Sequence, residues 1–399
     1  MPKITQSTAD ERSPLTFTAV EDGPGVPELL RATQELSLVR SEPEILEILR
    51  RTARRLVGAD AATIALREPD ACFYAEEDSV TPLWRGERLP LDASVSGWTM
   101  CHGEAAIIPD LSADDRVPAA YRATFVRSLA VMPIRARDPL GAIGVYWAQP
   151  HQASAHEVRL LQGLAESAAV AFQNAGVYTG LEATRAETLR RLALAAEYRD
   201  DETFHHTERV AHVATHIAGK LGLDATFQAL IRQAAPLHDV GKLAISDAIL
   251  LKPDVLTATE ILHVRAHAVS GAEILAGSHS DVLQMAEEIA LTHHEWWDGS
   301  GYPNRLSYDQ IPISGRIVAL ADVFDVLIHE RPYKQPWTLD EALREIDHLS
   351  GRQFDPMVVT AFFQLDEADL VVDPEEILAL TPGIRAVAES RQLVSSPAA

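Results

Sequence analysis

Histidine is concentrated in the second half of this 399-residue sequence. Of the 15 histidines, twelve fall between His205 and His348, which a random scatter would not produce. Several stand beside a carboxylate, beside one another or one helical turn from a carboxylate, namely Glu202 and His206, His238 and Asp239, His293 and His294. Side chains four residues apart on a helix project from one face and can share an ion. We therefore expect the chemistry of this chain in its second half.

The residue types in this segment indicate a particular ligand set. Imidazole and carboxylate groups are present, with His267 and Asp322 as further candidates, whereas both cysteines, Cys72 and Cys101, lie elsewhere. Such a set suits iron, manganese, zinc or nickel, and disfavours a cysteine-type zinc site or a calcium site made of oxygen alone. A single His-Asp pair would be a weak signal, because a lone histidine is more often a hydrogen-bonded core or surface residue.

These side chains need a scaffold that directs them inward. From residue 190 to about residue 385 the apolar spacing predicts one helix after another, with no strand-like run of comparable length. A helical bundle brings side chains from several helices into its core, which is how His and carboxylate metal sites are built. The second half is therefore predicted to be all-α.

Charge and composition limit the classes of molecule that this chain can bind. The chain has 35 Lys and Arg against 58 Asp and Glu, and the net charge of −23 opposes binding to duplex nucleic acid or an anionic membrane. An anionic substrate would need local cations or metal ions. With 47% hydrophobic and 23% charged residues, two cysteines, no leader-like start and no long apolar run, the sequence predicts a soluble cytoplasmic protein without membrane insertion.

The first half predicts a different fold. Residues 1–24 are polar and are interpreted as a disordered tail, and residues 26–57 contain two helical patterns. The second pattern is opened by Ser41, with Glu44 placed as in a capping box. Four β-rich runs follow, at residues 61–67, 105–108, 129–134 and 142–148. Turn residues separate them, which favours one antiparallel sheet with helices, an α+β domain.

A long helix is predicted to connect the two halves, from residue 154 to about residue 200. Its apolar residues recur at spacings of three and four, and the phase resumes after an interruption at Glu182 and Arg185. The recurring residues are Leu161, Leu164, Ala168, Ala171, Ala175, Tyr178, Leu189, Leu192 and Ala196. One interpretation is a parallel two-helix rod that makes a homodimer. The alternative is one amphipathic helix that packs on its own domains.

The first half resembles a GAF domain over roughly residues 26–175. The resemblance depends on the segments 94–98, 105–111, 128–134 and 141–147. It implies a small-molecule sensor, whose ligand the sequence does not identify. Bilin-binding relatives use a Cys-His pair, but Cys101-His102 precedes an earlier strand than theirs. We therefore expect Cys101 to be a small apolar filler.

The second half resembles the HD-GYP family over about residues 198–385. The matching segments are Glu202-x-x-x-His206-x-x-Arg209-Val210, His238-Asp239-Val240-Gly241-Lys242, His267, His293-His294-Glu295-x-x-Asp298-Gly299-x-Gly301-Tyr302-Pro303, Asp322-x-x-Asp325 and Arg331-Pro332-Tyr333-Lys334. The segment from His293 to Pro303 is long and unusual, which makes the match specific. The resemblance implies an enzyme that hydrolyses cyclic di-GMP to linear pGpG, with GMP as a further product, at two or three divalent metal ions, iron or manganese.

The resemblance also assigns roles to single residues. Asp239 would bridge two metals, and the other ligands would be Glu202, His206, His238, His267, His293, His294 and Asp322. Glu202 is the ligand that accompanies a third metal in family members that have one. Lys242 would act with Asp239 in catalysis by reaching the scissile phosphate or positioning the water. The substrate would be held by Tyr302, Arg331 and Lys334.

Other polar and aromatic residues nearby have no assigned position. His212 and His216 also stand four residues apart, and we expect them to be structural or exposed. Trp296 and Trp297 could line the substrate mouth or simply cover the bundle.

The expected division of the chain is a tail, a GAF-like sensor, a connecting helix, an HD-GYP phosphodiesterase domain and a second tail, at residues 1–24, 25–175, 155–200, 198–385 and 386–399. Two alternative functions stay open. One is a non-catalytic cyclic-dinucleotide receptor or signalling scaffold. The other is a phosphohydrolase that acts on another cyclic dinucleotide, because metal ligands contact only phosphate.

Overall fold

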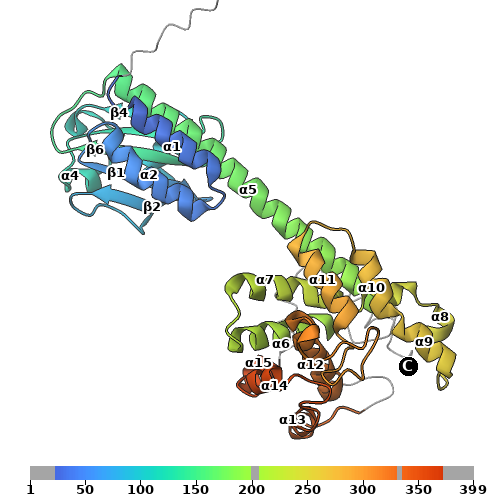
Figure 1. The fold of residues 1–399 in the computed structure, drawn as a ribbon. Coiled ribbons are helices and arrows are strands. Elements are labelled where there is room, and N and C mark those ends of the chain that lie inside the picture. The colour runs from blue at the N-terminus through green and yellow to red at the C-terminus, as the bar shows by residue number, and fades with distance from the viewer. Residues whose placement is uncertain (1–22, 199–205, 330–334, 372–399) are drawn as a thin grey trace, which may run out of the picture. The chain divides into compact units, whose positions relative to one another are not determined.

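The chain forms two compact units, Met1–Leu181 and Glu182–Ala399, which we call the sheet unit and the helical unit (Figure 1). The computed structural model describes residues 23–198, 206–329 and 335–371. No helix within these residues combines the length and the apolar character that a membrane span requires.

The sheet unit contains one antiparallel sheet with the strand order β3-β2-β1-β6-β5-β4. The strands are β1 (Ala61–Arg67), β2 (Ala71–Ser79), β3 (Arg88–Pro90), β4 (Ala106–Ile108), β5 (Ser128–Ile134) and β6 (Gly141–Trp147). The helices and short 3₁₀ turns are α1 (Val26–Leu38), α2 (Glu42–Leu56), η1 (Leu91–Ala93), α3 (Val95–His102), η2 (Leu111–Ala113), α4 (Ala119–Arg122) and the first part of α5 (Ala155–Glu197). The predicted α+β fold is confirmed.

Both faces of the sheet are covered, because successive strand residues point into two different cores. In β5, Ala130 and Met132 pack with residues of α1, α2 and α5, whereas Leu129 and Val131 pack with residues of α3 and α4. A strand buried on both faces reads as a continuous apolar run. This is why β1, β5 and β6 could be predicted from the sequence.

Strands β2 and β3 were not predicted. The second half of β2 is acidic, and its carboxylates are held by partners outside the strand: Glu77 accepts the backbone N–H groups of Leu83 and Trp84, and Asp78 lies 3.1 Å from Arg54. From the sequence alone, a run of acidic residues of this kind indicates a solvent-exposed loop, because its partners are not visible there. Strand β3 is too short to show a period.

Ser41 is the N-cap residue of α2, as predicted, but the predicted capping box is wrong. Its hydroxyl donates a hydrogen bond to Glu44 Oε2 at 2.5 Å and accepts none from the first turn of the helix. The serine and the glutamate thus bond each other instead of the backbone N–H groups that a capping box satisfies.

Most of the predicted seam of α5 in the sheet unit is part of that unit's own core. Leu161, Leu164, Ala168, Ala171 and Ala175 are between 0% and 6% exposed. A second chain cannot contact side chains that are buried in this way. For these residues the structure favours the alternative, an amphipathic helix that packs on its own domain.

The helical unit is built from short helices. They are α6 (His206–Lys220), α7 (Ala225–Ala234), η3 (Ala235–Leu237), η4 (Val240–Ala244), α8 (Asp247–Leu250), α9 (Ala258–Arg265), α10 (His267–Leu275), α11 (Asp281–Thr292), η5 (Tyr308–Gln310), α12 (Ile313–Ile328), α13 (Leu339–His348), α14 (Pro356–Phe362) and α15 (Glu367–Leu370). Apart from one isolated bridge between Ser350 and Phe354, the described part of this unit has no β-structure. The all-α prediction is confirmed.

The end of α5 belongs to the core of the helical unit. Ala193 is 2% exposed within this core, and Leu189 and Leu192 pack against its edge. The same core contains Val210 of α6 and Phe324 of α12, both fully buried. The second part of the predicted seam therefore also packs inside the chain.

Candidate metal centre

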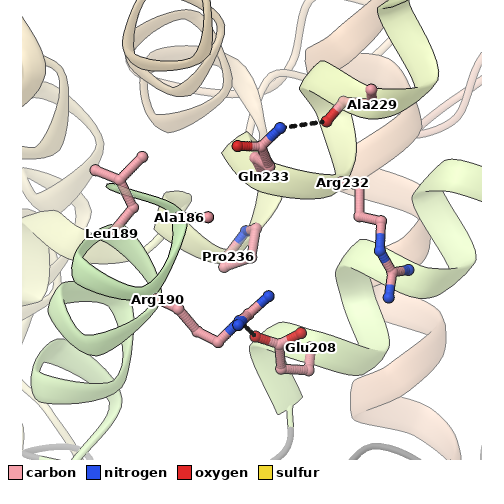
Figure 2. Close-up of a pocket in the computed structure, with 8 residues that line it drawn as sticks. All are labelled: Ala186, Leu189, Arg190, Glu208, Ala229, Arg232, Gln233 and Pro236. Atoms are coloured by element: carbon pink, nitrogen blue, oxygen red, sulfur yellow. Dashed lines mark hydrogen bonds and ion pairs between the residues drawn. The ribbon is translucent and has the colours of Figure 1, made fainter. Parts of the chain in front are cut away.

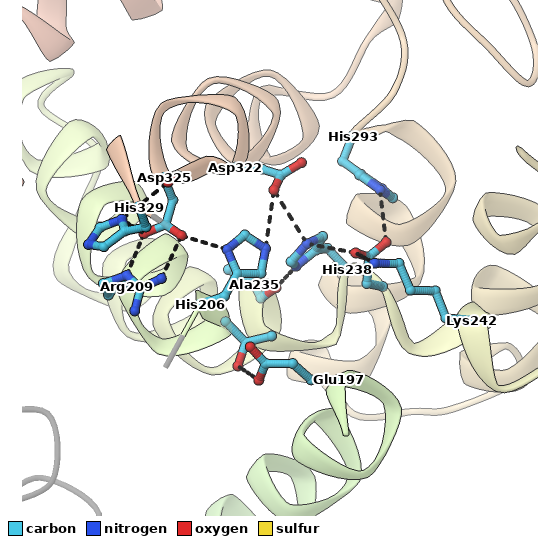
Figure 3. Close-up of polar contacts among 12 residues, drawn as sticks. Glu197, His206, Arg209, Ala235, His238, Lys242, His293, Asp322, Asp325 and His329 are labelled. Carbon is cyan, nitrogen blue, oxygen red and sulfur yellow. Dashed lines mark hydrogen bonds and ion pairs between the residues drawn. The ribbon is translucent and has the colours of Figure 1, made fainter. Parts of the chain in front are cut away.

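The structure brings the predicted ligands that it describes into two adjoining clusters. Within each cluster the ligand atoms all lie within 4.8 Å of one another. The first cluster is Asp239, His267, His293 and His294, and the second is His206, His238 and Asp322. Seven predicted ligands from five segments thus converge in the core of the bundle, and several of them are drawn in Figure 3.

Helix ends and turns place most of these side chains. His267 is the first residue of α10, His293 directly follows α11, and His206 is the first described residue of α6. His238 and Asp239 lie between η3 and η4, where Pro236 and the tight turns prevent a longer helix. The ends of several short helices therefore meet at the site, and each end places one or two predicted ligands there.

Four of the histidines are fixed in the same tautomer. The Nδ1 atom of His238 lies 2.9 Å from the carbonyl of Ala235, and that of His267 lies 2.6 Å from the carbonyl of Val264. His293 Nδ1 faces carbonyl oxygens of α11, and His206 Nδ1 faces a carboxylate. Since these oxygens only accept, each Nδ1 carries a proton, and Nε2 is the atom that each neutral ring offers to a metal.

These Nε2 lone pairs face other electron-rich atoms. His267 Nε2 and His293 Nε2 are 3.4 Å apart, and they lie 3.2 and 3.6 Å from Asp239 Oδ1. His238 Nε2 and Asp239 Oδ1 are buried without a hydrogen bond. Converging acceptors of this kind require a cation between them. The residues present therefore fit divalent metal ions.

Asp239 lies between the two clusters. Its Oδ1 faces His267 and His293, and its Oδ2 is 3.4 Å from His238 Nε2, which belongs to the second cluster. Oδ2 is also 2.9 Å from Lys242 Nζ. One carboxylate can thus reach both clusters, one oxygen toward each.

The carboxylates stay charged in spite of their burial. Burial would raise the pKa of Asp239, but Lys242, His238 and His267 hold it well below its usual range. Burial acts in the same direction on Asp322, whose pKa is nevertheless lowered by His206 and His238. For His294, burial together with His293 and His267 lowers the pKa well below its usual value. Ionised carboxylates and neutral imidazoles are the forms that bind metal.

Asp325 is a functional residue whose role the sequence did not reveal. Its carboxylate accepts a hydrogen bond from His206 Nδ1 at 2.7 Å and two from Arg209, at 2.6 and 2.9 Å, and it is 3% exposed (Figure 3). His329 Nδ1 lies 3.1 Å from the same carboxylate. A carboxylate in this place fixes the tautomer and orientation of a metal-binding histidine. The signal was present in the spacing Asp322-x-x-Asp325, but spacing alone does not say which carboxylate faces the metal.

Asp325→Asn is expected to weaken metal binding by about 10-fold to 100-fold, because carboxylates that orient a metal-binding histidine have effects of this size. The amide keeps the shape but loses the charge that holds His206 and Arg209. Metal affinity of the folded protein, measured by titration with Mn²⁺, checks the prediction. Asp309→Asn is the matched control, since the side chain of Asp309 is 89% exposed. Equal affinities in the two variants would contradict the role.

The signature loop after α11 is organised by Glu295. This buried carboxylate accepts the backbone N–H groups of Asn304 at 2.6 Å and Leu306 at 3.0 Å, which closes the loop on itself. Gly301 is required by close packing, because a Cβ atom there would lie 2.3 Å from the backbone nitrogen of Trp296. The loop delivers Tyr302 against His294, with the two rings stacked 4.7 Å apart.

A pocket of about 400 Å³ opens beside the first cluster. Asp239, Lys242, His267, His294, Tyr302 and Asp322 line it together with an apolar wall of Ile249, Leu250, Leu256, Val264 and Val326. Three predicted catalytic or substrate-binding residues, Asp239, Lys242 and Tyr302, are thus at the pocket. Trp296 and Trp297 do not line it, which favours their role as cover of the bundle.

Three predicted site residues, Glu202, Arg331 and Lys334, lie outside the described residues. His212 and His216 join neither cluster. Burial lowers the pKa of His212 to about 4, and His216 Nδ1 donates to the carbonyl of His212. Their predicted structural role agrees with this arrangement.

The end of α5 is bonded to the first turn of α6. Arg190 Nε lies 2.8 Å from Glu208 Oε1, and Figure 2 shows this pair beside a small cavity of about 170 Å³. Thr207 donates a hydrogen bond to Glu197 Oε2 at 3.2 Å. Thr207 and Glu208 are the two residues after His206, so α5 contacts the chain next to a metal-ligand position.

The sheet unit has a separate pocket of about 480 Å³. Trp98, Cys101, His102 and Arg116 are among its lining residues, and Trp98 stacks against His102 with the ring centroids 4.4 Å apart. The prediction that Cys101 is an apolar filler is wrong, because this thiol is exposed, whereas Cys72 is the buried one. Cys101 lies in the last turn of α3, on the side that faces solvent. The spacing of apolar residues in this short helix did not show which side is exposed.

The core under this pocket is filled by aromatic residues. Tyr74, Trp84, Tyr121 and Tyr146 pack ring against ring and are at most 6% exposed. The tyrosine hydroxyls bond one another and nearby side chains, for example Tyr74 to Tyr121 at 3.2 Å. Burial raises the pKa of Tyr74 to about 12. These four side chains thus form a packed part of the core, separate from the residues that line the pocket.

Comparison with known families defines the class of both units. Residues 39–173 match the model of the GAF domain, and residues 192–358 match the model of the HD domain. The chain therefore carries a GAF domain followed by an HD domain, and an HD domain implies divalent metal binding. The predicted combination of these two domain types is confirmed.

Several curated proteins are similar to the chain. It is 51% identical over 181 residues to the cyclic di-GMP phosphodiesterase of Thermotoga maritima, covering 45% of this chain and 49% of that protein. It is 48% identical over 184 residues to the cyclic di-GMP phosphodiesterase response regulator RpfG of Xanthomonas campestris, covering 46% and 49%. A 3'3'-cGAMP-specific phosphodiesterase of Vibrio cholerae is 46% identical over 201 residues, covering 50% and 38%. The chain thus spans about half the length, or less, of these relatives.

Proposed function

We propose that the chain is a metal-dependent phosphodiesterase that hydrolyses cyclic di-GMP to linear pGpG, with GMP as a further product. The observation that carries the proposal is the pair of adjoining His and Asp clusters, in which Asp239 faces both. The relatives named as cyclic di-GMP phosphodiesterases support the choice of substrate. When bound, divalent ions supply an activated water and neutralise the charge of the phosphate.

The residues of the chain would then act as follows. Asp239 would bridge two ions, and six other residues would complete the ligands: His206, His238, His267, His293, His294 and Asp322. Lys242, which lines the pocket beside Asp239, would hold a phosphate oxygen or the water. Tyr302 would contact phosphate through its hydroxyl, because its ring is already stacked on His294.

The metal count and identity belong to the same proposal. We propose iron or manganese, which suit a set of imidazole and carboxylate ligands. Two ions would occupy the two clusters, and Glu202 would hold a third. Arg331 and Lys334 would supply further phosphate contacts, Arg331 as a fork and Lys334 as a point charge.

Product analysis tests this function. Protein purified without oxygen and loaded with iron or manganese is incubated with cyclic di-GMP, and the products are separated by chromatography. Linear pGpG or GMP supports the proposal. No product from a metal-filled protein would overturn it, and titration of cyclic di-GMP binding would then test the alternative of a non-catalytic receptor.

A second candidate function is hydrolysis of another cyclic dinucleotide. One observation favours it: the chain is also similar to a phosphodiesterase named for 3'3'-cGAMP. Rates on cyclic di-GMP and on cyclic GMP-AMP, measured with the same metal-loaded protein, separate the two candidates.

The GAF domain is proposed as a sensor that regulates this activity. Its pocket on α3, lined by Trp98, His102 and Arg116, would receive a small ligand. The bonds between α5 and the first turn of α6 would carry the effect to His206. The proposed division of labour is a sensor at 25–175, a connecting helix at 155–200 and an effector at 198–385, in a cytoplasmic protein.

A homodimer is proposed, through a face of α5 other than the predicted one. Val170, Val177 and Leu181 are 59%, 64% and 60% exposed, and together with the exposed Asn174 they follow a heptad spacing. An asparagine within such a seam sets register and favours two strands.

Val177→Glu combined with Leu181→Glu is expected to convert a dimer to a monomer. At each of the two positions, a glutamate of one chain would be buried opposite the same glutamate of the other chain, and like charges repel. Light scattering during size-exclusion chromatography measures the mass. Thr179→Glu is the control, since it lies on the outer side of the same helix. A dimer that survives the double change would contradict this seam.

A further inference from the structure

Arg265 is a cation next to Tyr302, which lines the pocket, and it has no role in the site described above. Its guanidinium carbon lies 4.8 Å from the centroid of the Tyr302 ring, and the ring is stacked on His294. The side chain is exposed, at the last residue of α9. A chain of three stacked groups thus runs from a metal-ligand residue to the surface of the protein.

The charge of Arg265 is available to a ligand. None of the carboxylates in the described residues lies within ion-pair distance of it, and its contact is with the ring of Tyr302. Lys242, the other described cation at the pocket, differs in this respect, since its Nζ is 2.9 Å from Asp239. In a chain with a net charge of −23, an unneutralised cation beside a pocket attracts an anionic or electron-rich ligand.

The neighbouring wall suits a flat base. Ile249, Leu250, Leu256 and Val264 contribute apolar surface to the pocket of about 400 Å³, and Val264 directly precedes Arg265. A dinucleotide whose phosphate is held by metal ions at the two clusters has a base that must pack against the nearby surface. An apolar wall with a donor at its edge is the usual form of a base-binding site.

We propose that Arg265 is a specificity-determining residue that donates two hydrogen bonds to O6 and N7 of a guanine held against this wall. The proposal rests on the proposed function and specifies its substrate preference. Guanine presents two acceptors on that edge, whereas adenine presents an amino donor beside N7, which would face the guanidinium. Tyr302 is the positioning residue, because its ring lines the pocket and holds the guanidinium beside it.

The test uses Arg265→Gln and Arg265→Lys in the full chain loaded with metal. Steady-state kinetics with cyclic di-GMP give kcat and KM, and inhibition of that reaction by cyclic di-AMP gives the affinity for adenine. For Arg265→Gln we expect KM to rise about 10-fold to 100-fold with kcat little changed, since a bidentate base contact has this weight. Inhibition by cyclic di-AMP should stay as in the wild type. Arg265→Lys should not restore KM, because an ammonium lacks the fork.

His263→Gln is the matched control. His263 is exposed on the same helix, where its Nδ1 bonds the carbonyl of Thr259, and, unlike Arg265, it is not stacked on Tyr302. Equal weakening of both nucleotides by Arg265→Gln would overturn the base contact and indicate a phosphate contact instead. A fall in kcat with loss of metal would overturn it as well, by showing an indirect effect through Tyr302 and His294.

The measurements also distinguish failure of the proposed function. If the wild type turns over no cyclic di-GMP, the function fails, and direct titration of cyclic di-GMP and cyclic di-AMP binding still tests Arg265. Guanine preference that Arg265→Gln removes would support its role in a receptor. Binding that is the same in wild type and variant would overturn it.

Discussion

Asp239→Asn is expected to lower kcat for cyclic di-GMP by more than about 100-fold, since even the loss of a group that only orients a metal ligand costs about 10-fold to 100-fold. The amide nitrogen would replace one of two oxygens that face His238 on one side and His267 and His293 on the other. An amide group cannot bridge two cations as a carboxylate does. Metal per protein, measured by elemental analysis, should fall together with activity.

The control for this change is Glu273→Gln, which removes a carboxylate from the exposed face of α10. It should leave metal content and kcat as in the wild type. Circular dichroism should show the same helix content for both variants. An Asp239→Asn protein that keeps its metal and its turnover would refute the bridging role.

Gly241→Ala is expected to destabilise the fold by about 3 kcal/mol and to abolish most activity, because overpacking a tight contact has a cost of this order. A Cβ atom at this position would lie 1.9 Å from the carbonyl oxygen of His267 and 2.5 Å from the nitrogen of Gly271. Both atoms are backbone and cannot rotate away. Helix α10 would have to move, and with it the His267 side chain that faces Asp239. Urea unfolding and kcat measure the two effects.

Gly219→Ala provides the matched control in the same unit. A Cβ there would meet only the flexible side chain of Gln228, at 3.6 Å or more. Alanine favours a helix by up to about 1 kcal/mol over glycine, so this variant should be as stable as the wild type or slightly more stable. If Gly241→Ala behaved in the same way, the close approach of η4 and α10 would not be what positions His267.

The sequence predicted the site better than it predicted how the site is supported. Seven ligands could be recognised because the ordered motif preserves their types, and the structure brings all seven together. Asp325 is one helical turn from Asp322, and only the fold shows that the first faces His206 Nδ1 and the second faces Nε2. Arg265 lies outside every motif and becomes visible only through its contact with Tyr302.

In the sheet unit, the features that the sequence did not predict also depend on contacts that only the fold shows. Strands with two buried faces are apolar throughout and were recognised, whereas the acidic end of β2 depends on partners such as Arg54. The seam of α5 was recognised as a periodic pattern, but periodicity does not say which surface covers it. Leu161 and Ala175 are covered by their own unit, and the exposed row through Val177 lies on another face of the helix.

The two ends of α5 have a consequence for modularity. Leu161 is buried in one core, and Ala193 is buried in another, within a single uninterrupted helix. A recombination event that began the helical unit at residue 198 would remove Leu189, Leu192 and Ala193 from its core. The apolar residues that they cover would then be exposed to solvent. Exchange of the sheet unit between such proteins would therefore be confined to a short window, around Val177 to Arg185, where the helix is exposed. Crossovers in natural or designed fusions should collect there.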